Sequence, residues 1–132
     1  MENINFNLEN LGQVLNQLNI DDVNALEFGV IGFDDEGIVK LYNSHESKMA
    51  ALSIESVIEE DYFNSVAPCM NNFLVAQKFE DAIDEKVILD QVMDYVLTLK
   101  MKPTRVKLRL MSDPLLALNY LAILRLNLYN ND

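Results

Sequence analysis

The 132-residue sequence predicts an α+β domain: a five-stranded antiparallel sheet with helices on one face and a helical cap at the N-terminus. Two β-rich runs stand near the start and three near the end, and the residues between them are spaced as in helices. Half of the residues are hydrophobic and 23% are charged, which is typical of a globular chain. We expect one domain over 1–132, with a cap at 1–24 and a core at 25–128.

The first part of the chain predicts a helix followed by a hairpin. Residues 8–18, LENLGQVLNQL, place apolar side chains at spacings of three and four, so we expect a short amphipathic helix that packs on the sheet from outside. Residues 25–33 and 38–43 are β-rich runs on either side of the acidic turn DDEG. They predict a hairpin in which Gly37 takes a positive φ.

The middle of the chain, residues 44–84, is expected to be helical or irregular. Ser53 is a candidate N-cap, although Ser56 stands where a capping box needs an acid or an amide. Residues 73–83, FLVAQKFEDAI, predict a longer connecting helix.

Three further strands are predicted at 87–99, 104–111 and 118–128. The last of these is rich in leucine and also fits a helix by its period. Its assignment as a strand therefore depends on its context in the sheet.

The charge of the chain limits its partners. A net charge of −11 disfavours binding to nucleic acid or to an anionic membrane surface, so we expect neither partner. Six of the ten basic residues lie in 100–132, and five form an alternating strip. We interpret this strip as the solvated face of a strand in preference to a binding patch. It consists of Lys100, Lys102, Arg105, Lys107 and Arg109.

Cys69 is the only cysteine, so an internal disulfide is impossible. A free cysteine is commonly a small buried hydrophobic residue. His45 is the only histidine and has no second ligand at metal-binding spacing, so we interpret it as a surface residue and expect no metal. The opening MENINFNLEN lacks the features of a signal peptide, and no apolar run is long enough to span a membrane. A cytoplasmic location is the default expectation.

Short stretches along the chain together match a known family. They are FGVI at 28–31, the turn residues Asp34 and Gly37, YNSHE at 42–46, VAPC at 66–69, KF at 78–79 and MKPTRVK at 101–107. From the N-terminus to about residue 126 the sequence resembles the photoactive yellow protein family of PAS-fold photoreceptors. The pairing of Y-N-x-x-E with V-A-P-C is far more specific than any pattern common to PAS domains.

The resemblance implies a blue-light photoreceptor with a covalent chromophore. In that family the cysteine carries 4-hydroxycinnamic (p-coumaric) acid as a thioester, so Cys69 would be the attachment site and Ala67 would line the pocket. Tyr42 and Glu46 would hydrogen-bond the phenolate, which requires Glu46 to be neutral at rest. Light-driven trans-to-cis isomerisation would then move a proton from Glu46 to the phenolate. A buried carboxylate would remain, loosening the helices and the cap.

Several positions depart from the family pattern. Ala50 stands where the family has a threonine and Leu52 where it has an arginine lid, and neither can donate a side-chain hydrogen bond. Met70 follows the cysteine in place of a small polar residue, and Leu97 replaces an aromatic residue. Met101 is retained and is similar to the methionine that the family links to thermal recovery. These changes make the expected pocket more apolar and less anchored.

The departures leave three functional hypotheses. The first is a retuned photoreceptor, favoured by the joint presence of Tyr42, Glu46 and Cys69. The second is a light-independent PAS-type module that binds another aromatic acid or acyl group, or none, or that dimerises through its C-terminal strands. The third, a thiol enzyme or acyl-transfer protein using Cys69, has least support because no nucleophile elbow is recognisable. We expect no enzyme activity and a signal passed to an unidentified downstream protein. A homodimer remains open.

Overall fold

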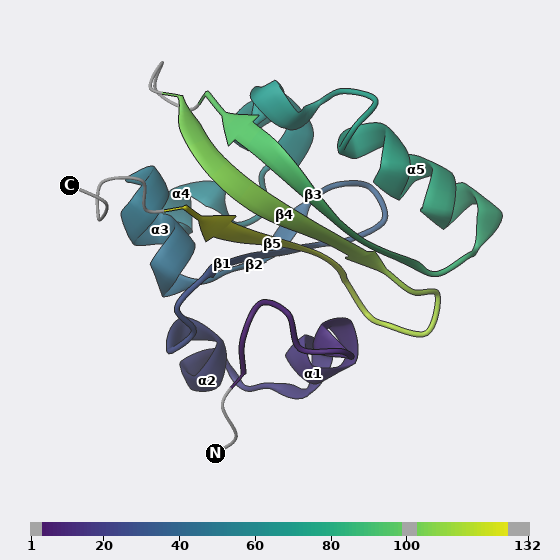
Figure 1. Cartoon of the computed structure of the whole chain (residues 1–132), viewed down its shortest axis with the longest axis horizontal. Helices are drawn as coiled ribbons and strands as arrows, with labels where there is room; N and C mark the ends of the chain where they lie inside the picture. The colour runs from purple at the N-terminus through teal and green to yellow at the C-terminus, as the bar shows by residue number, and fades with distance from the viewer. Residues whose placement is uncertain (1–3, 99–102, 127–132) are drawn as a thin grey trace.

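The protein folds as one twisted sheet with helices on both faces (Figure 1). The structure is a computed structural model that describes residues 4–98 and 103–126. Five antiparallel strands lie in the order β2-β1-β5-β4-β3. The strands are β1 (Gly29–Phe33), β2 (Val39–Tyr42), β3 (Leu89–Leu97), β4 (Thr104–Ser112) and β5 (Asn119–Arg125). The helices are α1 (Leu11–Gln17), α2 (Ile20–Asn24), α3 (Ser44–Ala50), α4 (Ile54–Val57), the π-helix η1 (Tyr62–Val66), the 3-10 helix η2 (Pro68–Met70) and α5 (Ala76–Glu85).

Side-chain alternation along the strands divides the interior into two cores. On β5, Leu121 and Ile123 face one side of the sheet, whereas Tyr120 and Ala122 face the other. The helix-side core consists of Ile31, Phe33, Val39, Tyr42, Val57, Tyr62, Phe63, Ala67, Met70, Val75, Phe79, Leu97, Val106, Leu108, Leu110, Leu121 and Ile123. The cap-side core consists of Phe6, Leu11, Leu15, Val23, Leu26, Phe28, Val30, Met111, Tyr120 and Ala122.

The predicted fold class and the five strands are confirmed. Within the leucine-rich segment, Asn119–Arg125 is a strand because β5 lies between β1 and β4 and pairs with both. Its residues from Asn119 to Ile123 are buried irrespective of face, and this explains why the sequence shows no clear alternation. The first strand starts later than predicted, at Gly29, because α2 and its following turn precede it.

Local signals in the sequence predicted several turns and caps correctly. Gly37 has a φ of 87°, and its N–H donates to the Asp34 carbonyl at 2.9 Å. The Ser53 hydroxyl accepts from the Ser56 N–H at 3.2 Å and caps the short α4. A second cap escaped the prediction: the Asn19 side chain accepts from the Asp22 N–H at 2.8 Å and begins α2.

The basic strip on β4 is only partly solvated, which corrects the interpretation from sequence. Arg105 is exposed and Lys107 pairs with Asp94 at 2.8 Å near the surface, but Arg109 is 5% exposed. Lys100 and Lys102 lie outside the described residues. The strip therefore runs from solvent into the space beneath the N-terminal cap.

Arg109 ties the N-terminal segment to the sheet. Its Nε and Nη2 atoms donate to the two carboxylate oxygens of Asp90 on β3, each at 2.8 Å. Its remaining donors reach three backbone carbonyls of the segment before α1: Phe6 at 2.9 Å, Leu8 at 2.7 Å and Glu9 at 3.1 Å. One guanidinium thus satisfies a carboxylate on β3 and three peptide oxygens of the N-terminal segment.

No helix within residues 4–98 and 103–126 combines the length and the apolar character that crossing a lipid bilayer requires.

Replacing Arg109 should loosen the N-terminal cap. In Arg109→Gln the carboxylate and the three carbonyls lose their shared donor, so we expect a loss of about 2–3 kcal/mol in the free energy of unfolding. Urea denaturation would measure this loss, and limited proteolysis would show earlier cleavage before α1. In the control Lys107→Gln the exposed pair with Asp94 is lost, and the unfolding midpoint should not change. Equal midpoints for the two variants would contradict the role given to Arg109.

Candidate functional site

The motif Y-N-x-x-E forms the junction between β2 and α3. Asn43 is fully buried, and its side-chain oxygen accepts from the N–H groups of Glu46 at 3.1 Å and Val30 at 3.0 Å. Its side-chain nitrogen donates to the carbonyls of Val23 at 3.1 Å and Phe28 at 3.0 Å. Asn43 therefore caps α3 and fastens it to β1 and α2. This cap fixes Glu46 in the first turn of the helix.

Glu46 is buried at the sheet and engages an arginine with both of its oxygens. Its Oε1 accepts from Nη1 of Arg125 at 2.6 Å, and its Oε2 accepts from Nη2 at 3.0 Å. The two side chains are 2% and 11% exposed. A guanidinium has donors only, so the two-bond geometry is that of an ionised carboxylate. This pairing is the kind that a carboxylate makes with arginine, whereas the family resemblance implies a neutral acid.

Strand register explains why Arg125 reaches Glu46. Gly29 on β1 stands opposite Ile123 on β5, and Arg125 follows two residues later on the same face. That face carries the helix-side core, so the last side chain of β5 points toward α3. Glu46 lies directly over Gly29, where a Cβ atom would overlap the Glu46 Oε1 atom. The absence of a side chain at position 29 gives the carboxylate its place.

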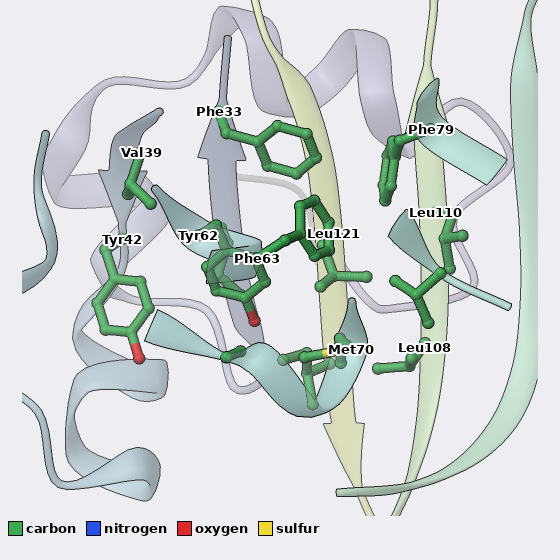
Figure 2. Close-up of a cluster of buried hydrophobic side chains, with 14 of the residues drawn as sticks. Phe33, Val39, Tyr42, Tyr62, Phe63, Met70, Phe79, Leu108, Leu110 and Leu121 are labelled. Atoms are coloured by element: carbon green, nitrogen blue, oxygen red, sulfur yellow. The ribbon is translucent and has the colours of Figure 1, made fainter. Parts of the chain in front are cut away.

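Two tyrosine hydroxyls belong to the same environment. Burial raises the pKa of Tyr42 above its ordinary value, the Glu46 charge adds to this, and Arg125 opposes it. Burial also raises the pKa of Tyr62 well above its ordinary value, with Glu46, Tyr42 and Cys69 acting in the same direction. Figure 2 shows both hydroxyl groups pointing toward one end of the helix-side core, away from Phe33 and Phe79. The pKa of Tyr62 is therefore affected by all three residues that the sequence motifs single out: Tyr42, Glu46 and Cys69.

Cys69 lies in η2, and two side chains from other parts of the chain hydrogen-bond its backbone carbonyl. Its carbonyl oxygen accepts from the Tyr95 hydroxyl at 2.9 Å and from the Asn72 side-chain nitrogen at 3.2 Å. The thiol-bearing residue is half-buried and packs against the helix-side core, while the next residue, Met70, is fully buried within it. The cysteine thus borders the core that also contains Tyr42.

The other residues predicted for the site lie around these groups. Ala50 is buried on α3, one turn after Glu46, and Leu52 is partly buried against the helix-side core. Ala67 and Leu97 are buried members of that core. Met101 lies outside the described residues.

His45, expected at the surface, is half-buried on α3 beside Glu46. Burial is the main cause that lowers the pKa of His45. The charges of Arg125 and Lys48 lower this pKa further, whereas those of Glu46 and Glu27 raise it. At neutral pH the imidazole is therefore neutral and adds no cation to the site.

Arg125 is the site residue that sequence reasoning missed. It interrupts the apolar run LNYLAILRLNL as a single cation, and a lone charge inside a predicted buried strand is a signal in itself. Tyr62, Tyr95 and Asn72 also went unnoticed, because nothing in their local sequence separates them from ordinary core or turn residues.

Comparisons with known proteins give consistent results. No protein-family model matches the chain. Photoactive yellow protein of Halochromatium salexigens is 32% identical over 113 residues, covering 83% of this chain and 87% of that protein. Photoactive yellow protein of Rhodothalassium salexigens is 26% identical over 110 residues, with the same coverage.

Solved structures agree. The photoactive yellow protein domain of the sensor histidine kinase Ppr from Rhodospirillum centenum superposes with a TM-score of 0.77 and 27% identity, covering 84% of this chain and 96% of that one. The PAS domain of the Cronobacter turicensis quorum-sensing receptor RpfR has a TM-score of 0.59 at 9% identity, a likeness of fold alone.

Adding one methyl group at Gly29 should displace the Glu46 carboxylate. We expect Gly29→Ala to lower the free energy of unfolding by about 1–3 kcal/mol, because the new Cβ overlaps an oxygen held in a two-bond ion pair. Urea denaturation measures this. Gly12→Ala is the matched control: its Cβ would meet its neighbours at 3.5 Å or more, so the change should stay below about 1 kcal/mol. Similar results for both variants would show that Glu46 has room to move.

Proposed function

Because the chain belongs to the photoactive yellow protein family, we propose that it is a photoreceptor in which Cys69 carries a 4-hydroxycinnamoyl group as a thioester. The observation that supports this most is that Tyr42 and Tyr62 belong to one buried core and that Cys69 packs against the same core. The thiol and the polar groups that the sequence motifs single out thus belong to one neighbourhood.

The side chains present suit a flat phenolic guest. A half-buried thiol borders the helix-side core, Tyr42 belongs to that core, and the buried Glu46 carboxylate is paired with the partly buried Arg125. Apolar surroundings with a few polar groups are typical of sites that orient an aromatic ligand. Leu52 and Ala67 supply apolar contacts without competing hydrogen bonds.

Each residue has a defined task in the proposed photoreceptor. When bound, the hydroxycinnamoyl group supplies light absorption and a trans-to-cis isomerisation. Cys69 Sγ anchors the acyl end, and Tyr42 and Glu46 hold the phenolic oxygen. We propose that Glu46 exchanges a proton with that oxygen. The transfer from Glu46 that the family implies requires its acid form, which the ion pair with Arg125 opposes.

The output of such a receptor would be conformational and not catalytic. Glu46 is connected through its own N–H to Asn43, which also bonds β1 and α2, so a change of charge at Glu46 acts on the packing of α3 and the cap. We propose that a downstream protein in the cytoplasm reads this change by contact.

A second function has one observation in its favour. Both oxygens of Glu46 are already paired with Arg125, and Ala50 and Leu52 donate no side-chain hydrogen bond, so the site is satisfied without a chromophore. A light-independent PAS-type module that binds another aromatic acid, or that dimerises, would have these properties.

Chromophore loading separates the two functions. Purified protein treated with the anhydride of p-coumaric acid should gain the mass of one hydroxycinnamoyl group and a light-bleachable absorption band. Cys69 Sγ forms the bond to the acyl carbon as the bond to the departing carboxylate breaks, and the thiol proton passes to solvent. Cys69→Ala should gain neither signal. A folded wild-type protein that takes up no acyl group would support the light-independent module.

A further inference from the structure

We propose that two copies of this chain associate through β3, which pairs with itself across a twofold axis and joins the two five-stranded sheets edge to edge. The inference is independent of the proposed photoreceptor function, because it concerns the backbone and the exposed side chains of an edge strand and needs no ligand.

The two edges of the sheet differ in how their backbone groups are used. At β2, the Val39 N–H donates to the Glu60 carbonyl at 2.9 Å and the Val39 carbonyl accepts from the Glu59 N–H at 2.8 Å, so the chain itself covers that edge. β3 is the opposite edge, and within residues 4–98 and 103–126 its backbone has no backbone partner besides β4. An edge of nine residues with unpaired N–H and C=O groups is a template for another strand.

Exposed apolar side chains lie along the same edge. Val92 and Val96 on β3 are 47% and 49% exposed, and Ile88, directly before the strand, is 71% exposed. The two valines alternate with Asp90 and Asp94 on the cap-side face of the sheet, where Val92 lies opposite the cap-binding arginine of β4. A strand placed beside β3 would cover part of this apolar surface as well as the unpaired backbone.

A second copy of β3 fits this edge by length and by charge. A twofold axis perpendicular to the sheet makes the pair antiparallel and keeps like faces on the same side. Centred on Met93, the pairing overlaps the whole strand. Val92 then lies opposite Asp94 of the second copy, and Val96 lies opposite its Asp90. Centred on Val92 or on Asp94 instead, the pairing would set acid opposite acid, which is destabilising. The charges of β3 therefore favour the register with full overlap.

The proposed contact is not acidic, unlike the chain as a whole. The net charge of the chain is −11. On the cap-side face, however, β4 carries three cations, Arg105, Lys107 and Arg109, beside only two acids on β3. Two copies thus meet where acidic repulsion is locally compensated. The remaining repulsion acts at long range and is screened by salt, so the association should strengthen as ionic strength rises.

The first test measures self-association by sedimentation. Wild type should dimerise with increasing concentration, and Val92→Glu should raise the dissociation constant about tenfold, because it places an acid opposite Asp94 at two symmetric positions. Val92→Lys should lower the constant, since the lysine meets that same aspartate. Ile20→Glu on α2 is the matched control: it makes the same change of charge at a side chain that is 56% exposed, and it should have no effect. Circular dichroism verifies that each variant is folded.

The second test examines the register by cross-linking. In a Cys69→Ala background, Met93→Cys should form a disulfide-linked dimer under mild oxidation, because residue 93 lies opposite itself in the proposed pairing. Ile20→Cys in the same background measures linkage by chance collision and should form little dimer.

Three outcomes would overturn the proposal. The first is a wild type that stays monomeric up to millimolar concentration. The second is a Val92→Lys variant that weakens association as much as Val92→Glu, which would contradict the charge-matched register. The third is a Met93→Cys variant that cross-links no more than Ile20→Cys. None of these results affects the acylation of Cys69, so the photoreceptor function is tested separately.

Discussion

The candidate site is organised around one buried ion pair, between Glu46 at the start of α3 and Arg125 at the end of β5. These residues are far apart in sequence and meet because β5 lies beside β1, where Gly29 leaves space for the carboxylate. The pair links the helix α3 to the end of the central strand β5. A change in the charge of either partner would affect the packing of α3 on β5, because a buried charge is strongly destabilising once its partner is lost.

This pair alters what the family resemblance implies for signalling. If Glu46 gives up a proton in a site that holds no cation, the resulting carboxylate is unpaired, and relieving that cost drives structural loosening. Here Arg125 is already in position to accept the charge. A carboxylate at position 46 would therefore have a counter-ion in this protein.

A second arginine, the buried Arg109, has a similar role on the opposite face of the sheet. Arg109 on β4 joins Asp90 and three carbonyls of the N-terminal segment, as Arg125 joins Glu46 on the helix side. In both cases a multidentate guanidinium binds a segment outside the sheet to a strand inside it. Asn43 connects the two faces, because its side chain bonds α2, β1 and α3 together. The cap and the site are thus neighbours in one hydrogen-bonded network.

The sequence by itself determined the fold class, the five strands, the Gly37 turn, the Ser53 cap and the family, because these depend on periodicity, local backbone preference and short motifs. It also singled out Tyr42, Glu46 and Cys69. Only the tertiary structure decided that Glu46 is paired, that Arg109 is buried and that Tyr62 neighbours all three of those residues. The physical reason is that charge pairing depends on strand order and register. Those place Arg125 beside a residue 79 positions earlier in the chain, a distance that no local pattern spans.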